Sequence, residues 1–321
     1  MEYRAMDRRT FLGVSTSCSA HLLAMAAGAR PFAGRFFGPP TARQVVAQEP
    51  WGRLEQIGDG LWALISTPLE DRTTLSNGGI IAGSQGTLVV ESFASARGAA
   101  WMAEQARLLT GRWPTHAVLT HFHGDHAGGI EGFGSEDGAT RLLATGITRD
   151  LVLDGVEDGS PRASILAEVV LLDPDNPTRI DLGGRTARIV PRGGHTPSDV
   201  SVEIDDPGVV YCGDLVWNRM FPNYRDAIPS RLSTDVRALV RGPETKYVPG
   251  HGPMATPGDL AQFIAVIDHV ESAARRAFDG GIPAAEAATS FGLPESLGEW
   301  FMFSPRYYEV ALEAWERELG Q

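Results

Sequence analysis

Short apolar runs recur along the first part of the chain in patterns typical of β-strands. Residues 54–65 alternate loosely between apolar and polar side chains, which favours extended structure. The runs 80–83 and 87–91 flank the turn Ser84-Gln85-Gly86, and this arrangement predicts a β-hairpin. The beginning of the folded part is therefore expected to be a sheet.

The pattern changes to helical spacing at residues 95–109. Apolar side chains recur there three and four positions apart, and Gly111 follows the last of them, where glycine commonly ends a helix. Residues 117–120 then form another apolar run, which predicts a buried strand. Strand, helix and strand in succession predict a mixed α/β sheet with helices packed outside it.

The rest of the chain continues this alternation and ends in a helical tail. Further strands are predicted at 141–144, 180–182, 186–190, 200–204 and 208–211, and a helix at 148–153. Residues 155–162 are acidic and are expected to form a surface loop. Three helices are predicted in the tail, at 260–278, 284–291 and 307–319. The aromatic side chains of this tail would suit either a cover over the sheets or a contact between subunits.

The first 47 residues have the composition of an export signal and linker. The twin-arginine pair Arg8-Arg9 precedes a moderately apolar stretch over 11–29, a pattern typical of the twin-arginine (Tat) route. A membrane anchor is the alternative, but the stretch falls short of the roughly 20 strongly apolar residues that span a bilayer. Small residues that could precede a cleavage site occur at 27–29 and 45–47. We expect a periplasmic or extracellular protein without a stable membrane anchor.

Residues 48–321 are then expected to form one catalytic domain. The segment 1–47 holds six arginines against two carboxylates, so its removal changes the formal net charge from −12 to −16. A chain this acidic repels phosphate backbones, so nucleic acid is not expected as a partner. One cysteine, Cys212, remains, and the domain can form no internal disulfide. The sequence does not define the oligomeric state.

The strongest chemical signal follows directly on the predicted strand over 117–120. Three histidines and an aspartate, His121, His123, Asp125 and His126, stand within six residues. Imidazole nitrogens and carboxylate oxygens are usual zinc ligands, and alternation along an extended segment places His121 and His123 on the same side. The pattern predicts a metal site, with Asp125 and His126 offset towards a second position. Surface or capping histidines are the alternative interpretation.

Three further ligand candidates follow in the order that such a site requires. His195 lies in a turn bounded by glycine and proline after a predicted strand, where a loop can direct a side chain into a cleft. Asp214 follows the apolar run 208–211, where a carboxylate could cap a helix or bridge two metal ions. His251 stands between two glycines after another apolar run. Five of the eight histidines therefore occupy strand-to-loop junctions. The other three are His21, His116 and His269.

The segments HFHGDH, GGHTPSD, CGDL and PGHG, in this order and spacing, resemble those of the metallo-β-lactamase fold hydrolase superfamily. The resemblance covers about residues 51–321. It implies an α/β fold, a four-layer αβ/βα sandwich, here followed by the helical tail. It also implies two zinc ions per chain. The first would be held by His121, His123 and His195, the second by Asp125, His126 and His251, and Asp214 would bridge them.

The residue at position 214 separates branches of the superfamily. The true β-lactamases have Cys or Ser where Asp214 stands, whereas a bridging Asp is the pattern of glyoxalase II-like thioesterases, lactonases and related hydrolases. Cys212 lies two residues too early to replace it and is expected to pack in the core. The run Gly213–Asn218 is similar to one in exported quinoprotein relay system zinc metallohydrolases. Glu91 stands where many members have Asp, and is expected to support the ligands rather than to bind metal.

The ligand set implies hydrolysis by metal-activated water. Two zinc ions about 3.5–4 Å apart lower the pKa of a shared water towards 7, so no side-chain nucleophile is needed. Asp125 is the expected catalytic residue, because it can orient this water and pass a proton to the leaving group. The substrate would be a small molecule with an ester, thioester, lactone or related bond. Iron or manganese could replace zinc in the same set of ligands.

Alternatives to a dinuclear zinc hydrolase stay open. A mononuclear iron dioxygenase acting on persulfides would use only the ligands of the first zinc together with Asp214. β-Lactamase activity and a non-catalytic role as a metal-binding accessory protein are the others. Substrate choice is expected to depend on the loops 69–79 and 217–231, the second of which could bind an anionic or aromatic substrate or could simply pack. The fold alone does not identify the substrate.

Overall fold

A computed structural model describes residues 43–67, 71–134 and 140–321. The described chain divides into two compact units. The N-terminal unit comprises the described residues up to Pro174 together with Asp181–Thr186. The C-terminal unit comprises Asp175–Ile180 and Ala187–Gln321. Each unit is built around its own sheet.

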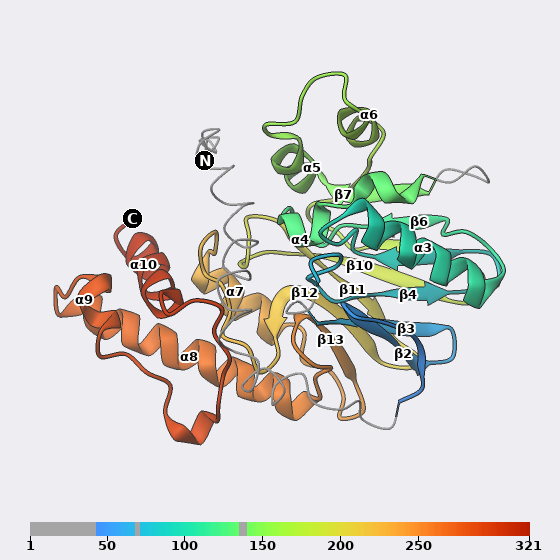
Figure 1. The fold of residues 1–321 in the computed structure, drawn as a ribbon. Helices are drawn as coiled ribbons and strands as arrows, with labels where there is room; N and C mark the ends of the chain where they lie inside the picture. Colours follow the sequence, from blue (N-terminus) through green and yellow to red (C-terminus); the bar gives the residue numbers. More distant parts are fainter. Residues whose placement is uncertain (1–42, 68–70, 135–139) are drawn as a thin grey trace. The chain divides into compact units, whose positions relative to one another are not determined.

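The N-terminal unit contains an eight-stranded sheet whose strands lie in chain order, from β1 to β8 (Figure 1). Neighbouring strands pair antiparallel from β1 to β5 and parallel from β5 to β8. Its strands are β1 (Val45–Glu49), β2 (Gly52–Gly58), β3 (Leu61–Ser66), β4 (Gly78–Ala82), β5 (Thr87–Val90), β6 (His116–Val118), β7 (Arg141–Thr145) and β8 (Val170–Leu172). The predicted hairpin of β4 and β5 is confirmed.

The helix α3 (Ala96–Thr110) covers part of this sheet with a small-residue face. Ser95 caps its first turn, since its side chain accepts a hydrogen bond from the N–H of Gly98, and Gly111 ends it in the left-handed region with φ 76°. The buried positions are Gly98, Ala99, Met102, Ala103 and Ala106, which recur at helical spacing. The predicted helix over 95–109 is therefore confirmed.

The remaining helices of this unit are short. They are α4 (Gly124–Ala127), the 3₁₀ turn η1 (Ile130–Phe133), α5 (Gly146–Leu153) and α6 (Pro161–Ala167). The sequence analysis missed α6, because the acidic stretch before it reads as a loop. Ser160 begins this helix by accepting a hydrogen bond from the N–H of Ala163, and Pro161 occupies the first turn.

The C-terminal unit contains a five-stranded sheet in the order β13-β12-β11-β10-β9 (Figure 1). Its strands are β9 (Thr178–Asp181), β10 (Thr186–Arg192), β11 (Asp199–Ile204), β12 (Val209–Trp217) and β13 (Lys246–His251). All nine residues of β12 are buried, and β12 pairs in parallel with β13. β12 is thus longer than the predicted run 208–211, because it continues through Asp214 to Trp217.

Helices form most of the rest of the C-terminal unit. They are α7 (Pro229–Arg237), α8 (Pro257–Asp279), α9 (Ala284–Ala288), the 3₁₀ turn η2 (Glu295–Leu297) and α10 (Tyr307–Leu319). α8 begins with a capping box in which Thr256 and Asp259 bind each other's backbone N–H groups. α8, α9 and α10 pack against one another, so the predicted helical tail is confirmed (Figure 1).

One boundary of the sequence analysis cuts through a strand. β1 includes Val45 and extends through Ala47, which had been assigned to the export segment, and it pairs with β2. Residues 1–42 of that segment, with Arg8-Arg9, lie outside the described residues, as do Leu69 and Glu70 of the loop 69–79. Among the described residues, no helix combines the length and apolar character required to cross a membrane.

A buried carboxylate in the C-terminal sheet is paired with three arginines. Glu203 on β11 accepts hydrogen bonds from Arg192 at 3.0 Å and Arg241 at 2.9 Å, and it also pairs with Arg188. Burial alone would raise the pKa of Glu203, but the hydrogen bonds from Arg241 and Arg192 outweigh burial, and its pKa lies below the ordinary value. The ionised carboxylate therefore stabilises the folded state.

Replacing Glu203 by Gln is expected to lower the free energy of unfolding at pH 7 by about 3 kcal/mol, because three arginines lose their shared anion. The stabilisation is present above the pH at which a glutamate of the unfolded chain ionises, and it is lost as the pH falls through the lowered pKa of the folded state. The difference in free energy of unfolding between wild type and Glu203→Gln, measured with urea, should therefore narrow below about pH 4. The exposed Glu244 provides the control, and a Glu244→Gln variant that lost as much stability would contradict this account.

Candidate metal centre

The N-terminal unit presents four predicted ligands on one short segment after β6. His121 and His123 lie on the extended part, and Asp125 and His126 lie on the following turn of helix, α4. All four side chains are at most 3% exposed. Such burial is unusual for histidine and aspartate, and it requires partners or a bound cation.

The nitrogens of two of these rings approach the same point. The distance from His121 Nε2 to His123 Nδ1 is 3.1 Å, as expected if alternation places both rings on the same side of the chain. His126 Nε2 lies 3.7 Å from a carboxylate oxygen of Asp125. The rings of His121 and His126 are also close, with 4.1 Å between their centroids, so the four donors form one cluster.

Glu91 determines which ring nitrogen carries the proton in His121 and in His126. Its Oε1 lies 2.9 Å from Nδ1 of His126, and because a carboxylate only accepts, that nitrogen donates and Nε2 keeps its lone pair. The hydroxyl of Thr120 donates to the same carboxylate at 2.5 Å, so its oxygen accepts from Nδ1 of His121 at 3.0 Å. Glu91 thus leaves Nε2 of both His121 and His126 as donors for a metal ion.

The backbone of this segment is also fixed by hydroxyl groups. Ser76 donates to the carbonyl of Asp125 at 2.7 Å, and Ser92 donates to the carbonyl of His126 at 2.9 Å. Glu91 itself adopts a left-handed backbone conformation with φ 78°, which is rare for a residue other than glycine and is often found at functional sites.

The C-terminal unit brings together the other three predicted ligands. One carboxylate oxygen of Asp214 lies 3.2 Å from His195 Nε2, and the other lies 3.3 Å from His251 Nε2. All three side chains are at most 4% exposed. His195 lies in the loop after β10 as predicted, whereas Asp214 lies within β12 and His251 is the last residue of β13.

A break in strand pairing accounts for the position of Asp214 within a strand. The register between β12 and β13 shifts on both sides of Gly213, whose φ is 52°. Such irregularities redirect side chains and are common beside functional sites. The sequence analysis ended this strand at residue 211, because the apolar pattern does not show that β12 continues through the irregularity.

Gly250 leaves the space that the Asp214 carboxylate occupies. A Cβ at position 250 would lie 1.9 Å from Oδ1 of Asp214 and 2.8 Å from the carbonyl carbon of Gly213, closer than any real contact. The glycine before His251 is therefore needed for the shape of this site. The sequence analysis noted that residue only as part of a motif.

The loop of His195 is held by a similar close approach. Gly194 has φ 113°, and a side chain there would meet the backbone N–H of Leu232 on α7 at 2.1 Å. The neighbouring N–H of Gly193 donates to Asp235 on the same helix at 2.8 Å. α7 therefore fixes the loop from which His195 extends.

The aromatic side chains of the loop 217–231 pack inside the C-terminal unit. Trp217, Phe221 and Tyr224 are at most 3% exposed. The Trp217 ring lies against that of His251, with 4.2 Å between centroids, and Phe303 from the tail meets Trp217 edge-on at 6.0 Å. Of the two interpretations of this loop, packing is the one that these contacts favour.

Cys212 is a core thiol rather than a ligand. Its side chain is buried on β12 and contacts the carbonyl of Val210 at 3.5 Å. Burial raises the pKa of this thiol far above its ordinary value, so it stays protonated at neutral pH. The expectation that it packs in the core is confirmed.

The donor set suits a metal ion in both units. Imidazole nitrogens and carboxylate oxygens are clustered and buried, and the described residues include groups of histidine and aspartate that could hold a metal ion. Ring orientation is fixed by Glu91, and the space for Asp214 is left by Gly250. The expectation that Glu91 supports the ligands is confirmed. The supporting roles of Gly250, Thr120, Ser76 and Ser92 were not identified from the sequence, because their contacts join positions far apart in the chain.

Comparison with known proteins gives the family and the fold. The family model described as metallo-beta-lactamase superfamily matches residues 72–251, which include all seven predicted ligands. A metallo-beta-lactamase from Pontibacter korlensis has a similar structure, with a TM-score of 0.53 and 18% identity over 70% of this chain and 99% of that one. The metallo-beta-lactamase FIM-1 from Pseudomonas aeruginosa, in its mono-zinc form, has a TM-score of 0.55 and 21% identity, and the match covers 69% of this chain and 98% of that one.

The sec-alkylsulfatase Pisa1 from Pseudomonas sp. has a similar structure over more of the chain. Its TM-score is 0.66 at 16% identity, and the match covers 95% of this chain but 62% of the alkylsulfatase. Likenesses at such identities show the fold alone. The predicted fold class, the α/β sandwich of this superfamily with C-terminal helices, is confirmed.

Replacing Glu91 by Gln is expected to weaken metal binding about 10- to 100-fold. The amide group that replaces Oε2 would face the backbone N–H of Thr120, which Oε2 accepts at 3.3 Å, and a neutral side chain holds the proton of His126 less strongly than a carboxylate does. Competition with a zinc chelator measures the affinity. Glu55, a buried carboxylate of β2 that pairs with Arg53, is the matched control, and Glu55→Gln should leave zinc affinity unchanged. Equal zinc affinity in Glu91→Gln and wild type would disprove the proposed role.

Replacing Gly250 by Ala is expected to displace the Asp214 carboxylate and to reduce metal affinity at least tenfold while the chain still folds. The added methyl group meets backbone atoms that cannot move aside cheaply. Gly242 has open space around it, so Gly242→Ala serves as the control. Metal content after dialysis and a circular dichroism spectrum distinguish loss of the site from loss of the fold, and full metal retention in Gly250→Ala would refute the prediction.

Proposed function

The chain belongs to the metallo-beta-lactamase superfamily, and from that premise we propose that it is a dinuclear zinc-dependent hydrolase of an ester, thioester, lactone or related bond. The observation that carries the proposal is the position of Asp214, whose two carboxylate oxygens approach two different histidines. A carboxylate with one oxygen directed to each of two ligands is well suited to bridge two ions.

The proposed ligands divide into two sets and one shared residue. We assign His121, His123 and His195 to the first zinc, Asp125, His126 and His251 to the second, and Asp214 to both. The short distances from His121 to His123 and from His126 to Asp125 support this division. The match of one family model to residues 72–251 supports placing all seven in one centre.

Bound zinc would supply activated water at neutral pH and would withdraw electron density from the bond to be cleaved. The chain's own residues supply orientation and proton transfer. Asp125 is proposed to accept the proton of the attacking water and to deliver it to the leaving group. Cys212 is excluded as a nucleophile, because it is buried and protonated.

The proposal does not specify which bond of this class is cleaved. Asp214 departs from the Cys or Ser of true β-lactamases, so a β-lactam is not the first choice. Sulfate esters belong in the substrate screen, because the alkylsulfatase matches 95% of the chain in fold. A small molecule remains the proposed substrate in each case.

Export also remains a proposal. The Arg8-Arg9 pair with the apolar stretch after it supports the Tat route, which carries folded proteins and would allow metal to be loaded before export.

Elemental mass spectrometry of the purified chain is expected to give about two zinc ions per chain, and Asp125→Ala about one. Hydrolysis of a panel of lactones, thioesters and sulfate esters should be lost in Asp125→Ala, with the circular dichroism spectrum unchanged. About one iron per chain with no zinc would contradict the proposal and would favour the persulfide dioxygenase. A loaded protein that cleaves no member of the panel would favour a non-catalytic role.

A further inference from the structure

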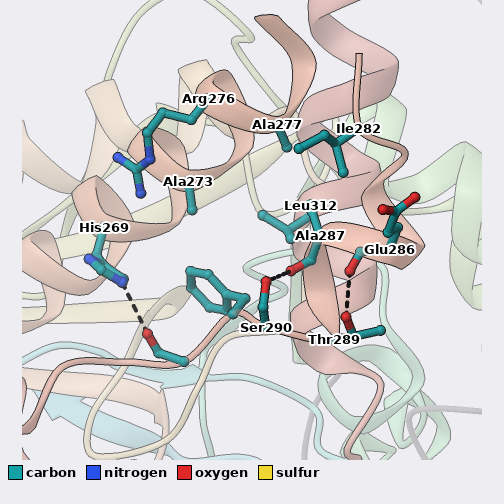
Figure 2. Close-up of a pocket in the computed structure, with 12 residues that line it drawn as sticks. His269, Ala273, Arg276, Ala277, Ile282, Glu286, Ala287, Thr289, Ser290 and Leu312 are labelled. Carbon is teal, nitrogen blue, oxygen red and sulfur yellow. Dashed lines mark hydrogen bonds between the residues drawn. The ribbon is translucent and has the colours of Figure 1, made fainter. Parts of the chain in front are cut away.

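The helices at the end of the chain enclose a pocket that no part of the proposed function uses. Its volume is about 410 Å³, within the range typical of small-molecule sites. The pocket lies between α8, the segment from α9 to Gly292, and α10 (Figure 2). It is lined by His269, Ala273, Arg276, Ala277, Ile282, Glu286, Ala287, Thr289, Ser290, Phe291, Gly292 and Leu312.

Specific contacts hold the walls of this pocket in place. His269 Nε2 lies 3.1 Å from the carbonyl of Gly292, so that nitrogen donates and joins α8 to the segment opposite. The Phe291 ring packs between His269, at 5.4 Å, and Tyr308 of α10, at 4.8 Å between centroids. The hydroxyl of Ser290 is bound to the carbonyl of Ala287 within its own turn. The pocket is therefore a built feature of the tail.

The pocket combines a partly exposed apolar side chain with a cation. Leu312 and Ala277 are buried, and Ile282 is 42% exposed although it is a large apolar side chain. Arg276 is exposed, and its side chain forms no hydrogen bond or ion pair with the residues that the structure describes. Its neighbour Arg275 instead pairs with Glu271 at 2.8 Å and covers the Trp315 ring.

The charges in the pocket are separated. Figure 2 shows Arg276 and His269 on one side of the drawn residues and Glu286 with Ile282 on the other. A cation in the last turn of α8 also complements the helix dipole, which accounts for the charge of Arg276 but not for the pocket beside it. An arginine fork pairs well with a carboxylate, and the exposed side chain of Ile282 suits a hydrocarbon chain.

We propose that this pocket binds a small organic carboxylate with an apolar tail, held by Arg276 at its charged end and by Ala273 and Ile282 along its chain. Binding here is separate from the metal centre and does not depend on the proposed hydrolysis. The two straight-chain probes octanoate and octylamine test the proposal, because they share a hydrocarbon chain and differ in the sign of the charge.

Isothermal titration of the full chain at physiological salt is expected to show octanoate binding with a Kd of about 1 mM or lower, and no binding of octylamine. Arg276→Gln should weaken binding about tenfold or more, whereas Arg275→Gln, which removes the same charge from the same helix, should leave it unchanged. Glu286→Gln should leave binding equal or tighter, because it removes a repelling charge.

Nuclear magnetic resonance then locates the ligand, because a carboxylate could also bind to zinc. Octanoate should shift the backbone amide signals of Ala273, Ala277 and Leu312. Shifts confined to His195, Asp214 and their neighbours would overturn the proposal, as would equal affinity in Arg276→Gln, tighter binding of octylamine, or no saturation by about 10 mM octanoate. Matching thermal melts of Arg276→Gln and wild type exclude unfolding as the cause of any loss.

Discussion

One buried carboxylate determines which ring nitrogen of His121 and His126 can bind a metal ion. A neutral imidazole can bind metal through only one nitrogen at a time, so something must hold the proton on the other. Glu91 does this directly for His126 and through Thr120 for His121. It does so from a strained backbone conformation at the end of β5. Its side chain reaches both partners from there.

The second constraint lies in the C-terminal unit, where other atoms approach the backbone at two glycines too closely to leave room for a side chain. Asp214 requires the absence of a side chain at Gly250, and the loop of His195 requires the same at Gly194. In both places the obstacle to a side chain includes main-chain atoms, which cannot rotate away as a long side chain would. The shape of the centre is therefore set as much by glycines as by the donor residues.

Much of the fold and the identity of the donors could be predicted from the sequence, because they depend on local patterns. The hairpin β4–β5, the helix α3 with Ser95 and Gly111 at its ends, and the tail helices follow from periodicity and capping. The extension of β12 through Asp214 could not be predicted, since a bulge at Gly213 interrupts the pattern. A supporting role for Glu91 was predicted, but its partners were not, and the roles of Ser76 and Gly250 could not be predicted, because each of the three acts on a residue between 35 and 49 positions away.

The pairing of β12 with β13 has a consequence for how the protein acquires its metal. Asp214 and His251 lie on neighbouring parallel strands, and α7 and its flanking loops separate them along the chain. Parallel pairing over such a separation closes a long loop and forms slowly compared with local structure. An unfolded or newly made chain therefore offers an ion only the local cluster from His121 to His126. High-affinity capture must wait for the sheet, so metal binding reports on completed folding and adds its free energy to the finished structure.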